Sequence, residues 1–346
     1  MSSDVSSLRV QDIGEQGLLK RLQPFCPNDI VGDDAAVISS LEPGQSLVVT
    51  TDVLVDGVHF SDRTTSPEDV GWRAAAANLS DLAAMGASAL GITVGLSVTG
   101  DTSVSWVEQV YQGLTSCLRQ YNTVIVGGDV VRSPLISLAI TAFGQVAPSL
   151  VIRRSAAKVG DAIVVTGVHG ASRAGLELLL NPEFGQNLSE VERSHLIKAH
   201  QRPKPRLDIL PLLWKILDPQ SKIKNTQSKI PIAGMDSSDG LVDAVIQICR
   251  FSGVGAIIER TKIPLPPTLY QLLPPEQAMN WALYGGEDFE LVLCLPSEPA
   301  QALVEKLGQG AAIIGTITAD QEICLKDSSS SYADEWLTQS QGFQHF

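Results

Sequence analysis

An alanine-rich segment at 67–86 places the strongest constraint on how this chain can fold. It begins with a proline and two acidic residues, a typical helix start, because proline suits the first helical position and acidic side chains favour the helix N-terminus. It ends at Gly86, and glycine commonly follows a helix end. Four successive alanines at 74–77 indicate close packing against a sheet. The segment therefore predicts a helix that covers a β-sheet.

Predicted strands and helices alternate along the N-terminal part of the chain, as in an α/β or α+β domain. The predicted strands lie at 47–52, 90–98, 123–126 and 135–146, with a further helix at 103–119. At 346 residues the chain is long for one core, so we expect two domains, at 1–148 and 149–346. In the second, the polar and unpatterned residues 218–231 predict a flexible surface insertion.

The composition excludes some classes of protein. A formal net charge of −13 argues against non-specific nucleic-acid binding, which needs a basic surface. It also makes an anionic substrate difficult to bind unless metal cations or a few arginines neutralise the charge locally. The five cysteines are scattered without a CxxC pair, which favours free thiols in a reducing cytosol. No apolar window approaches a membrane span, so a cytoplasmic protein is expected.

Thr50, Thr51 and Asp52 are polar residues at the expected end of the first strand. Side chains alternate along a strand, so Thr50 and Asp52 share one face and Thr51 points away. Thr51 could then contribute to a site through its backbone carbonyl, or through a kink. Hard oxygen ligands suit Mg²⁺, whereas the alternative is an ordinary strand end beside a turn. Taken alone, the stretch favours that alternative.

Other acidic residues sit at similar junctions. Asp34 precedes a short apolar strand next to another aspartate, and adjacent carboxylates repel each other. Asn78 and Asp81 lie on one face of the alanine-rich helix, where an aspartate needs a partner such as a metal or a helix N-terminus. Asp129 follows two glycines at an expected strand end. Each of these residues could also be a solvated turn or cap residue.

The second domain repeats the pattern. Residues 236–240 combine serines, aspartates and a glycine before a helix predicted to run to about 252; one N-cap needs one such residue, and this segment offers four. Glu287 lies among glycines and acids ahead of an apolar strand. Arg153 and Arg154 are either surface charge or anion ligands. HExxH, GxSxG and Walker A motifs are absent from the sequence, and many carboxylates with few bases point to several Mg²⁺ ions that assist phosphoryl transfer.

Seven short motifs, taken together in this order, resemble the thiamine-monophosphate kinase family. That family belongs to a superfamily of ATP-using enzymes with aminoimidazole ribonucleotide synthetase and selenophosphate synthetase. The motifs begin at Gly32, Thr50, Asn78, Gly127, Arg154, Asp236 and Gly285 and cover nearly the whole chain. Each is weak alone, but seven in order form a specific signal.

The resemblance implies roles for individual residues. It implies Mg²⁺ ligation by Asp34, Thr50, Thr51, Asp52, Asp81, Asp129, Asp236 and Asp239. It implies ATP contacts from Tyr111, Gly128, Asp129, Arg154 and Ser238, with Asp52, Asp129 and Arg154 as the catalytic set. It implies substrate contacts from His59, Glu287 and a C-terminal aromatic residue, with Phe343 preferred to Trp336.

The resemblance also implies an aminoimidazole ribonucleotide synthetase-like fold, with an ATP- and Mg²⁺-binding N-terminal domain whose sheet pairs in a homodimer. The C-terminal α/β domain would complete the active-site cleft. The implied reaction converts thiamine monophosphate and ATP to thiamine diphosphate and ADP, without a membrane or nucleic-acid partner. The alternatives are a sister synthetase that releases phosphate and a non-catalytic nucleotide-binding regulator. Selenophosphate synthetase is disfavoured because an N-terminal segment with active Cys and Lys residues is not found.

Overall fold

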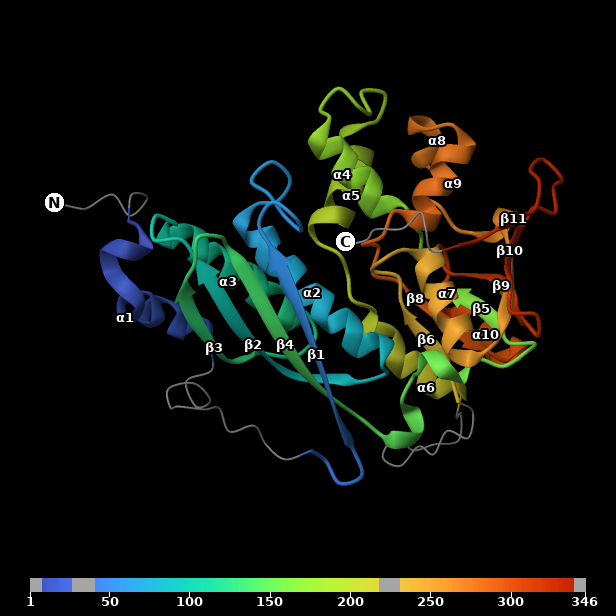
Figure 1. Ribbon diagram of the computed structural model, residues 1–346, viewed down its shortest axis with the longest axis horizontal. Helices are drawn as coiled ribbons and strands as arrows, with labels where there is room; N and C mark the ends of the chain where they lie inside the picture. The colour runs from blue at the N-terminus through green and yellow to red at the C-terminus, as the bar shows by residue number, and fades with distance from the viewer. Residues whose placement is uncertain (1–7, 27–40, 218–230, 339–346) are drawn as a thin grey trace. The chain divides into compact units, whose positions relative to one another are not determined.

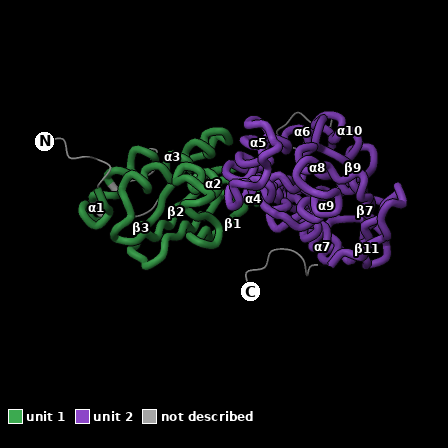
Figure 2. Tube along the Cα trace, turned by 90° about the horizontal axis from the view of Figure 1, so that it is seen from above, with its two compact units in different colours: residues 1–82, 88–145 green, residues 83–87, 146–346 purple. Residues whose placement is uncertain are grey.

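The computed structural model describes residues 8–26, 41–217 and 231–338, which form two compact units (Figure 1). Unit 1 comprises Met1–Leu82 and Ser88–Gln145; unit 2 comprises Ala83–Ala87 and Val146–Phe346 (Figure 2). Except for its last residue, the insertion expected at 218–231 lies outside the described residues.

Unit 1 is built on a four-stranded mixed sheet with the spatial order β1-β4-β2-β3. β2 pairs in parallel with β3 and antiparallel with β4. The strands are β1 (Ser46–Val55), β2 (Ser88–Val98), β3 (Ile125–Arg132) and β4 (Ser137–Val146). The helices are α1 (Val10–Leu22), α2 (Pro67–Ala84) and α3 (Val104–Gln120). α2 is the predicted alanine-rich helix, and a methyl group added at Gly71 would reach within 1.9 Å of a carbonyl oxygen of α3, so these two helices lie in direct contact.

The two faces of this sheet differ in burial. Leu138 and Ile140 of β4 are fully buried on the face that α2 and α3 cover (Figure 1). On the opposite face, Leu47 and Val49 of β1 are each 53% exposed, and Val53 is exposed as well. We call this second surface the open face; it carries the odd-numbered side chains of β1. An apolar sheet face of this kind usually marks an interaction surface.

Two expectations about strand ends in unit 1 are wrong. β1 continues to Val55, so the Thr50–Asp52 stretch lies within the strand and not at its end. β3 continues to Arg132, so Asp129 also lies within a strand. In both places valine-rich residues follow the polar ones and keep the alternation that a strand requires. The polar residues therefore project from the faces of the sheet.

Unit 2 is built on a seven-stranded sheet with the order β11-β10-β7-β9-β5-β8-β6. Neighbouring strands are antiparallel except for the parallel pair of β7 and β10. The strands are β5 (Ala162–Val165), β6 (Ala233–Asp236), β7 (Gly255–Glu259), β8 (Leu291–Leu295), β9 (Ala312–Thr318), β10 (Ile323–Lys326) and β11 (Glu335–Trp336).

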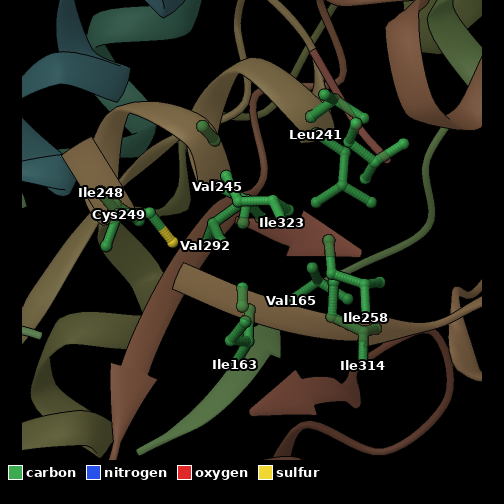
Figure 3. Packing of buried hydrophobic residues seen from close by; sticks show 14 of the residues in the cluster. Ile163, Val165, Leu241, Val245, Ile248, Cys249, Ile258, Val292, Ile314 and Ile323 are labelled. Atoms are coloured by element: carbon green, nitrogen blue, oxygen red, sulfur yellow. The ribbon is translucent and has the colours of Figure 1, made fainter. Parts of the chain in front are cut away.

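Helices cover both faces of this second sheet. α7 (Leu241–Ser252) and α9 (Pro275–Tyr284) pack on one face, in a core that includes Ile163 and Val292 (Figure 3). α6 (Leu210–Leu217) and α10 (Ser297–Leu307) pack on the other. A third cluster joins α4 (Ala171–Leu180), α5 (Glu190–Gln201) and α8 (Leu269–Leu272). The expected mixture of sheets and helices in two parts is therefore confirmed. Among the described residues, no helix combines the length and the apolar character needed to cross a membrane.

Candidate functional site

The polar residues of β1 face α2 across the covered side of the sheet. Thr50 Oγ1 donates a hydrogen bond to Asp81 Oδ2. The backbone N–H of Asp52 donates to Asn78 Oδ1 at 3.1 Å, and Asn78 Nδ2 donates to the Ala74 carbonyl at 3.0 Å. Exposure alternates along β1, with Thr51 exposed and Thr50 and Asp52 half-buried, which confirms the predicted shared face of Thr50 and Asp52. This face places hydroxyl and carboxylate oxygens, which are hard ligands of the kind that Mg²⁺ prefers, side by side.

Thr51 points to the open face, as the alternation of β1 predicts. Its Oγ1 lies 2.8 Å from Thr141 Oγ1 of β4. β1 runs without interruption through this position, so a kink does not redirect the side chain. Only the backbone carbonyl of Thr51 is left for a role on the covered face.

Asp129 is separated from Asp52 within unit 1. It pairs with Gly95 of β2, whose neighbours Val94 and Leu96 are buried on the covered face, so Asp129 projects toward the open face. β3 and β1 are opposite edges of the sheet, three strand spacings or about 14 Å apart. Asp129 Oδ1 accepts a hydrogen bond from the backbone N–H of Val130 at 2.9 Å. One copy of unit 1 therefore does not bring Asp52 and Asp129 together.

Glycine at 128 is required by the close approach of β2. A Cβ atom added at this position would lie 2.3 Å from the carbonyl oxygen of Val94, whereas one added at Gly127 would meet only a methyl group at 3.7 Å. The first contact is far shorter than a van der Waals separation and the second is ordinary. Gly128 thus holds the backbone of β3 against β2 next to Asp129.

The second group of acidic residues lies between β6 and α7. Asp236 is buried at the end of β6, and Ser238 Oγ donates a hydrogen bond to its Oδ1 at 3.0 Å. The N-cap position of α7 is Gly240, and no side chain there accepts a capping hydrogen bond. The capping explanation for Ser237, Ser238 and Asp239 is therefore wrong, and these residues form a polar turn instead.

A buried histidine contacts this turn through Ser237. His169 follows β5, is fully buried, and places its Nε2 3.1 Å from Ser237 Oγ. Burial lowers the pKa of His169 to about 4, so its imidazole is neutral near pH 7. Sequence analysis did not single out His169, because a lone histidine between turn residues carries no spacing signal.

Residues 285–290 form a strained loop that touches the same turn. Glu287 and Phe289 have φ values of 58° and 53°, which non-glycine residues rarely adopt. The backbone N–H of Glu287 donates to the Ser238 carbonyl at 2.6 Å. Asp288 accepts hydrogen bonds from the backbone N–H groups of Gly170, at 2.7 Å, and of Ser172 at the start of α4, at 2.9 Å. Burial raises the pKa of Asp288 to about 7 despite these two bonds.

The remaining predicted residues are dispersed over the two units. Arg154 Nη1 donates to Gln247 Oε1 of α7 at 2.6 Å. His59 Nδ1 accepts from the backbone N–H of Val55 at 3.0 Å. Tyr111 is buried in α3, and burial raises the pKa of its hydroxyl. The exposed Trp336 belongs to β11, whereas Asp34 and Phe343 lie outside the described residues.

The described carboxylates do not form a ready-made metal cage. Within residues 8–26, 41–217 and 231–338, no three His, Cys, Asp or Glu side chains converge as metal ligands. The oxygen-only donors Thr50, Asp52 and Asp81 nevertheless fit Mg²⁺ better than zinc or a redox metal. The candidate site of unit 1 is therefore a partial set of ligands that needs further oxygen donors.

Comparison with known proteins gives consistent matches over both units. Residues 32–146 match the model of the AIR synthase related protein, N-terminal domain, and residues 158–327 match that of the C-terminal domain. The chain is 52% identical to thiamine-monophosphate kinase of Synechococcus elongatus over 342 residues, covering 99% of each protein. It is 37% identical to the protein of that name from Escherichia coli K12, covering 91% of each.

Solved structures agree with these matches. Thiamine-monophosphate kinase from Stenotrophomonas maltophilia K279a is 31% identical with a TM-score of 0.74, over 92% of this chain and 96% of that chain. The structure described as AaThiL complexed with AMPPCP and TMP is 29% identical with a TM-score of 0.69, over 98% and 99%. Hydrogenase maturation protein HypE shares the fold at 19% identity and a TM-score of 0.71, over 93% of this chain and 97% of that chain.

Proposed function

The chain belongs to the thiamine-monophosphate kinase family, and we propose that it transfers the γ-phosphoryl group of ATP to thiamine monophosphate, giving thiamine diphosphate and ADP. The observation that carries this proposal is the 52% identity to a thiamine-monophosphate kinase over 99% of both proteins. A related solved structure is described as a complex with AMPPCP, an ATP analogue, and TMP.

The chemistry of this reaction suits the residues that the chain offers. The nucleophile is a phosphate oxygen that is already ionised near neutral pH, so a general base is not required. His169 is buried and His59 already accepts a backbone hydrogen bond through its Nδ1, which agrees with a mechanism that does not depend on histidine. Catalysis then rests on positioning and on charge stabilisation, to which the guanidinium of Arg154 contributes.

We propose that the oxygen donors hold several Mg²⁺ ions, which when bound would screen the negative charge of the polyphosphate. The ligands are Asp34, Thr50, the Thr51 carbonyl, Asp52, Asp81, Asp129, Asp236 and Asp239. ATP would be bound by Tyr111, Gly128, Asp129, Arg154 and Ser238. Thiamine monophosphate would be bound by His59, Glu287 and Phe343, and a carboxylate at Glu287 suits the cationic thiazolium ring.

A homodimer would remove the distance across the sheet that separates Asp52 from Asp129 in one copy. A second copy that covers the open face would bury the exposed side chains of Leu47 and Val49. Both β1 and β3 are edge strands, and edges of this length are normally paired or protected. Pairing β1 of one copy with β3 of the other would place Asp129 of the partner subunit on the strand next to the one that carries Asp52, with the two side chains on opposite faces of the joined sheet. The proposed site is therefore shared between two copies.

A complementation experiment tests this sharing directly. Asp52→Ala and Asp129→Ala are each expected to lose most activity while remaining folded. Co-expression of the two variants on differently tagged chains should restore about a quarter of wild-type turnover, because half of randomly paired dimers are mixed and each holds one intact site. Complete inactivity of purified mixed dimers would place both residues in one protomer's site. Asp320→Ala, an exposed aspartate, is the matched control and should keep wild-type turnover.

The reaction itself is tested by following thiamine diphosphate, ADP and free phosphate together with ATP, Mg²⁺ and thiamine monophosphate. Equal amounts of thiamine diphosphate and ADP, with little free phosphate, are expected. Activity should disappear with excess EDTA and return with added Mg²⁺. Free phosphate without thiamine diphosphate would instead indicate a sister synthetase with another acceptor.

A further inference from the structure

Glu287 is held in place by more than its own strained backbone. Its φ of 58° fixes an uncommon turn, and its N–H donates to the Ser238 carbonyl at 2.6 Å. Its side chain is 35% exposed, so the carboxylate can reach a ligand in solution. A glutamate side chain has three rotatable bonds, however, and the backbone alone does not fix where its carboxylate points.

The imidazole of His200 supplies the missing constraint. His200 belongs to α5, and its side chain is only 4% exposed. Its Nδ1 lies 3.4 Å from Glu287 Oε2 and 3.2 Å from Ser172 Oγ of α4. The same ring nitrogen thus faces both the carboxylate and a hydroxyl that belongs to the rigid start of a helix.

The backbone that carries His200 is packed directly against α4. A Cβ atom added at Gly175 of α4 would lie 2.0 Å from the Leu196 carbonyl and 3.0 Å from the Cβ of His200. The backbones of α4 and α5 are therefore in direct contact at this point. The N–H groups that start α4 donate to Asp288, the residue after Glu287. α5 therefore packs against α4, α4 binds the loop through Asp288, and the loop returns to α5 through the contact of Glu287 with His200.

From this geometry we propose that His200 is a positioning residue, which holds the Glu287 carboxylate in the orientation that binds thiamine monophosphate. The inference rests on the proposed function, and specifically on a substrate contact by Glu287. His200 is too deeply buried to act on the transferred phosphoryl group, so its effect reaches the substrate only through the carboxylate. Fixing a binding group in its productive orientation lowers the entropy lost on binding.

The test compares His200→Leu, His200→Asn and Glu287→Ala in steady-state kinetics. Leucine fills the space without a donor, and the KM for thiamine monophosphate should rise about tenfold, the lower end of the loss seen when a group that orients a metal ligand is removed. The asparagine amide can place an N–H near the position of Nδ1, so this variant should stay within about threefold of wild type. The KM for ATP should be unchanged in both variants. In the Glu287→Ala background, His200→Leu should have no further effect, since the group it positions is gone.

Each alternative outcome rejects the inference. Equal KM values in folded leucine and asparagine variants, or additive effects of His200→Leu and Glu287→Ala, would leave His200 with a packing role only. Should His200→Leu fail to fold, His200→Gln replaces it: its amide mimics Nε2 and not Nδ1, so its KM should rise while that of His200→Asn does not. A wild-type chain that forms no thiamine diphosphate would reject the proposed function itself. An active wild type with an unchanged KM in Glu287→Ala would reject this inference alone.

Discussion

Two groups in unit 2, His169 and Asp288, should give the stability of this protein opposite dependences on pH. Burial lowers the pKa of His169 from the ordinary 6.5 to about 4. Burial raises the pKa of Asp288 from the ordinary 3.8 to about 7. In both cases the fold favours the neutral form, but one group is a base and the other an acid.

The signs follow from which state binds the proton. Between pH 6.5 and 4 the unfolded chain protonates His169 and the folded chain does not, so the stability that this residue contributes is lost as the pH falls. Between pH 3.8 and 7 the folded chain keeps a proton on Asp288 that the unfolded chain has released, so the stability that this residue contributes is lost as the pH rises. Each slope is about 1.4 kcal/mol per pH unit, and the two nearly cancel from pH 4 to 6.5.

Replacing one of these two residues should reveal how the other makes the free energy of unfolding depend on pH. Relative to wild type, His169→Gln should gain about 3 kcal/mol in free energy of unfolding as the pH falls from 6.5 to 4. Asp288→Asn should gain about 4 kcal/mol, relative to wild type, as the pH rises from 4 to 7. The second figure is an upper bound, because Asp288 keeps some contact with solvent. Asparagine also loses one of the two acceptors that bind backbone N–H groups, which lowers stability by an amount independent of pH.

Urea unfolding at several pH values between 4 and 7, without nucleotide or metal, measures these differences. The Asp320→Asn variant removes an exposed carboxylate and controls for net charge. If the free energy of unfolding depends on pH in the same way for His169→Gln and wild type, His169 is not a buried neutral imidazole in the folded protein. Parallel curves for Asp288→Asn and wild type would show that Asp288 is ionised in the folded protein.

Three further changes have defined outcomes. Arg206→Met should destabilise the protein by about 3–5 kcal/mol in urea unfolding, because it leaves the largely buried carboxylate of Glu290 with a hydrogen bond from Thr166 but without its ion-pair partner. Adding Glu290→Gln should recover part of that loss. Gly128→Ala should lower the melting temperature and the activity, because its methyl group would meet a carbonyl oxygen of β2 at 2.3 Å, whereas Gly127→Ala should be tolerated. A thiol reagent should modify Cys26 fastest in the folded protein, since the other four cysteines are buried; faster labelling of a second thiol would contradict this packing.

Elements with their own start and stop signals could be predicted from the sequence. α2 and α3 lie within a residue or two of their predicted positions, because proline, glycine and amphipathic spacing act locally. β10 and β11 were not predicted, because they have four and two residues and exist only through pairing with distant strands.

The face on which Thr50 and Asp52 lie could be predicted from the sequence, but the buried histidines that contact the two loops of unit 2 could not. Periodicity places Thr50 and Asp52 on one face of β1, and the structure confirms this. His169 and His200 could not be found in this way, because each acts on a residue 68 or more positions away and carries no local pattern. Their importance depends on the folded arrangement of β5, α4 and α5 around two loops.

The order of the sequence motifs implies that Asp52 and Asp129 belong to one site. Within one copy of unit 1, however, the strands hold these two residues apart. A period of two residues puts Asp52 on the covered face of the sheet and Asp129 on the open face, at opposite edges. Exposure alternates without a break along β1, so the period of two holds through Thr50, Thr51 and Asp52. If Asp52 and Asp129 both bind Mg²⁺, as proposed, strand order and side-chain alternation require a second copy to bring another Asp129 close to Asp52. If a second copy covers the open face, weakening the dimer should abolish Mg²⁺-dependent turnover before it affects the folding of unit 2.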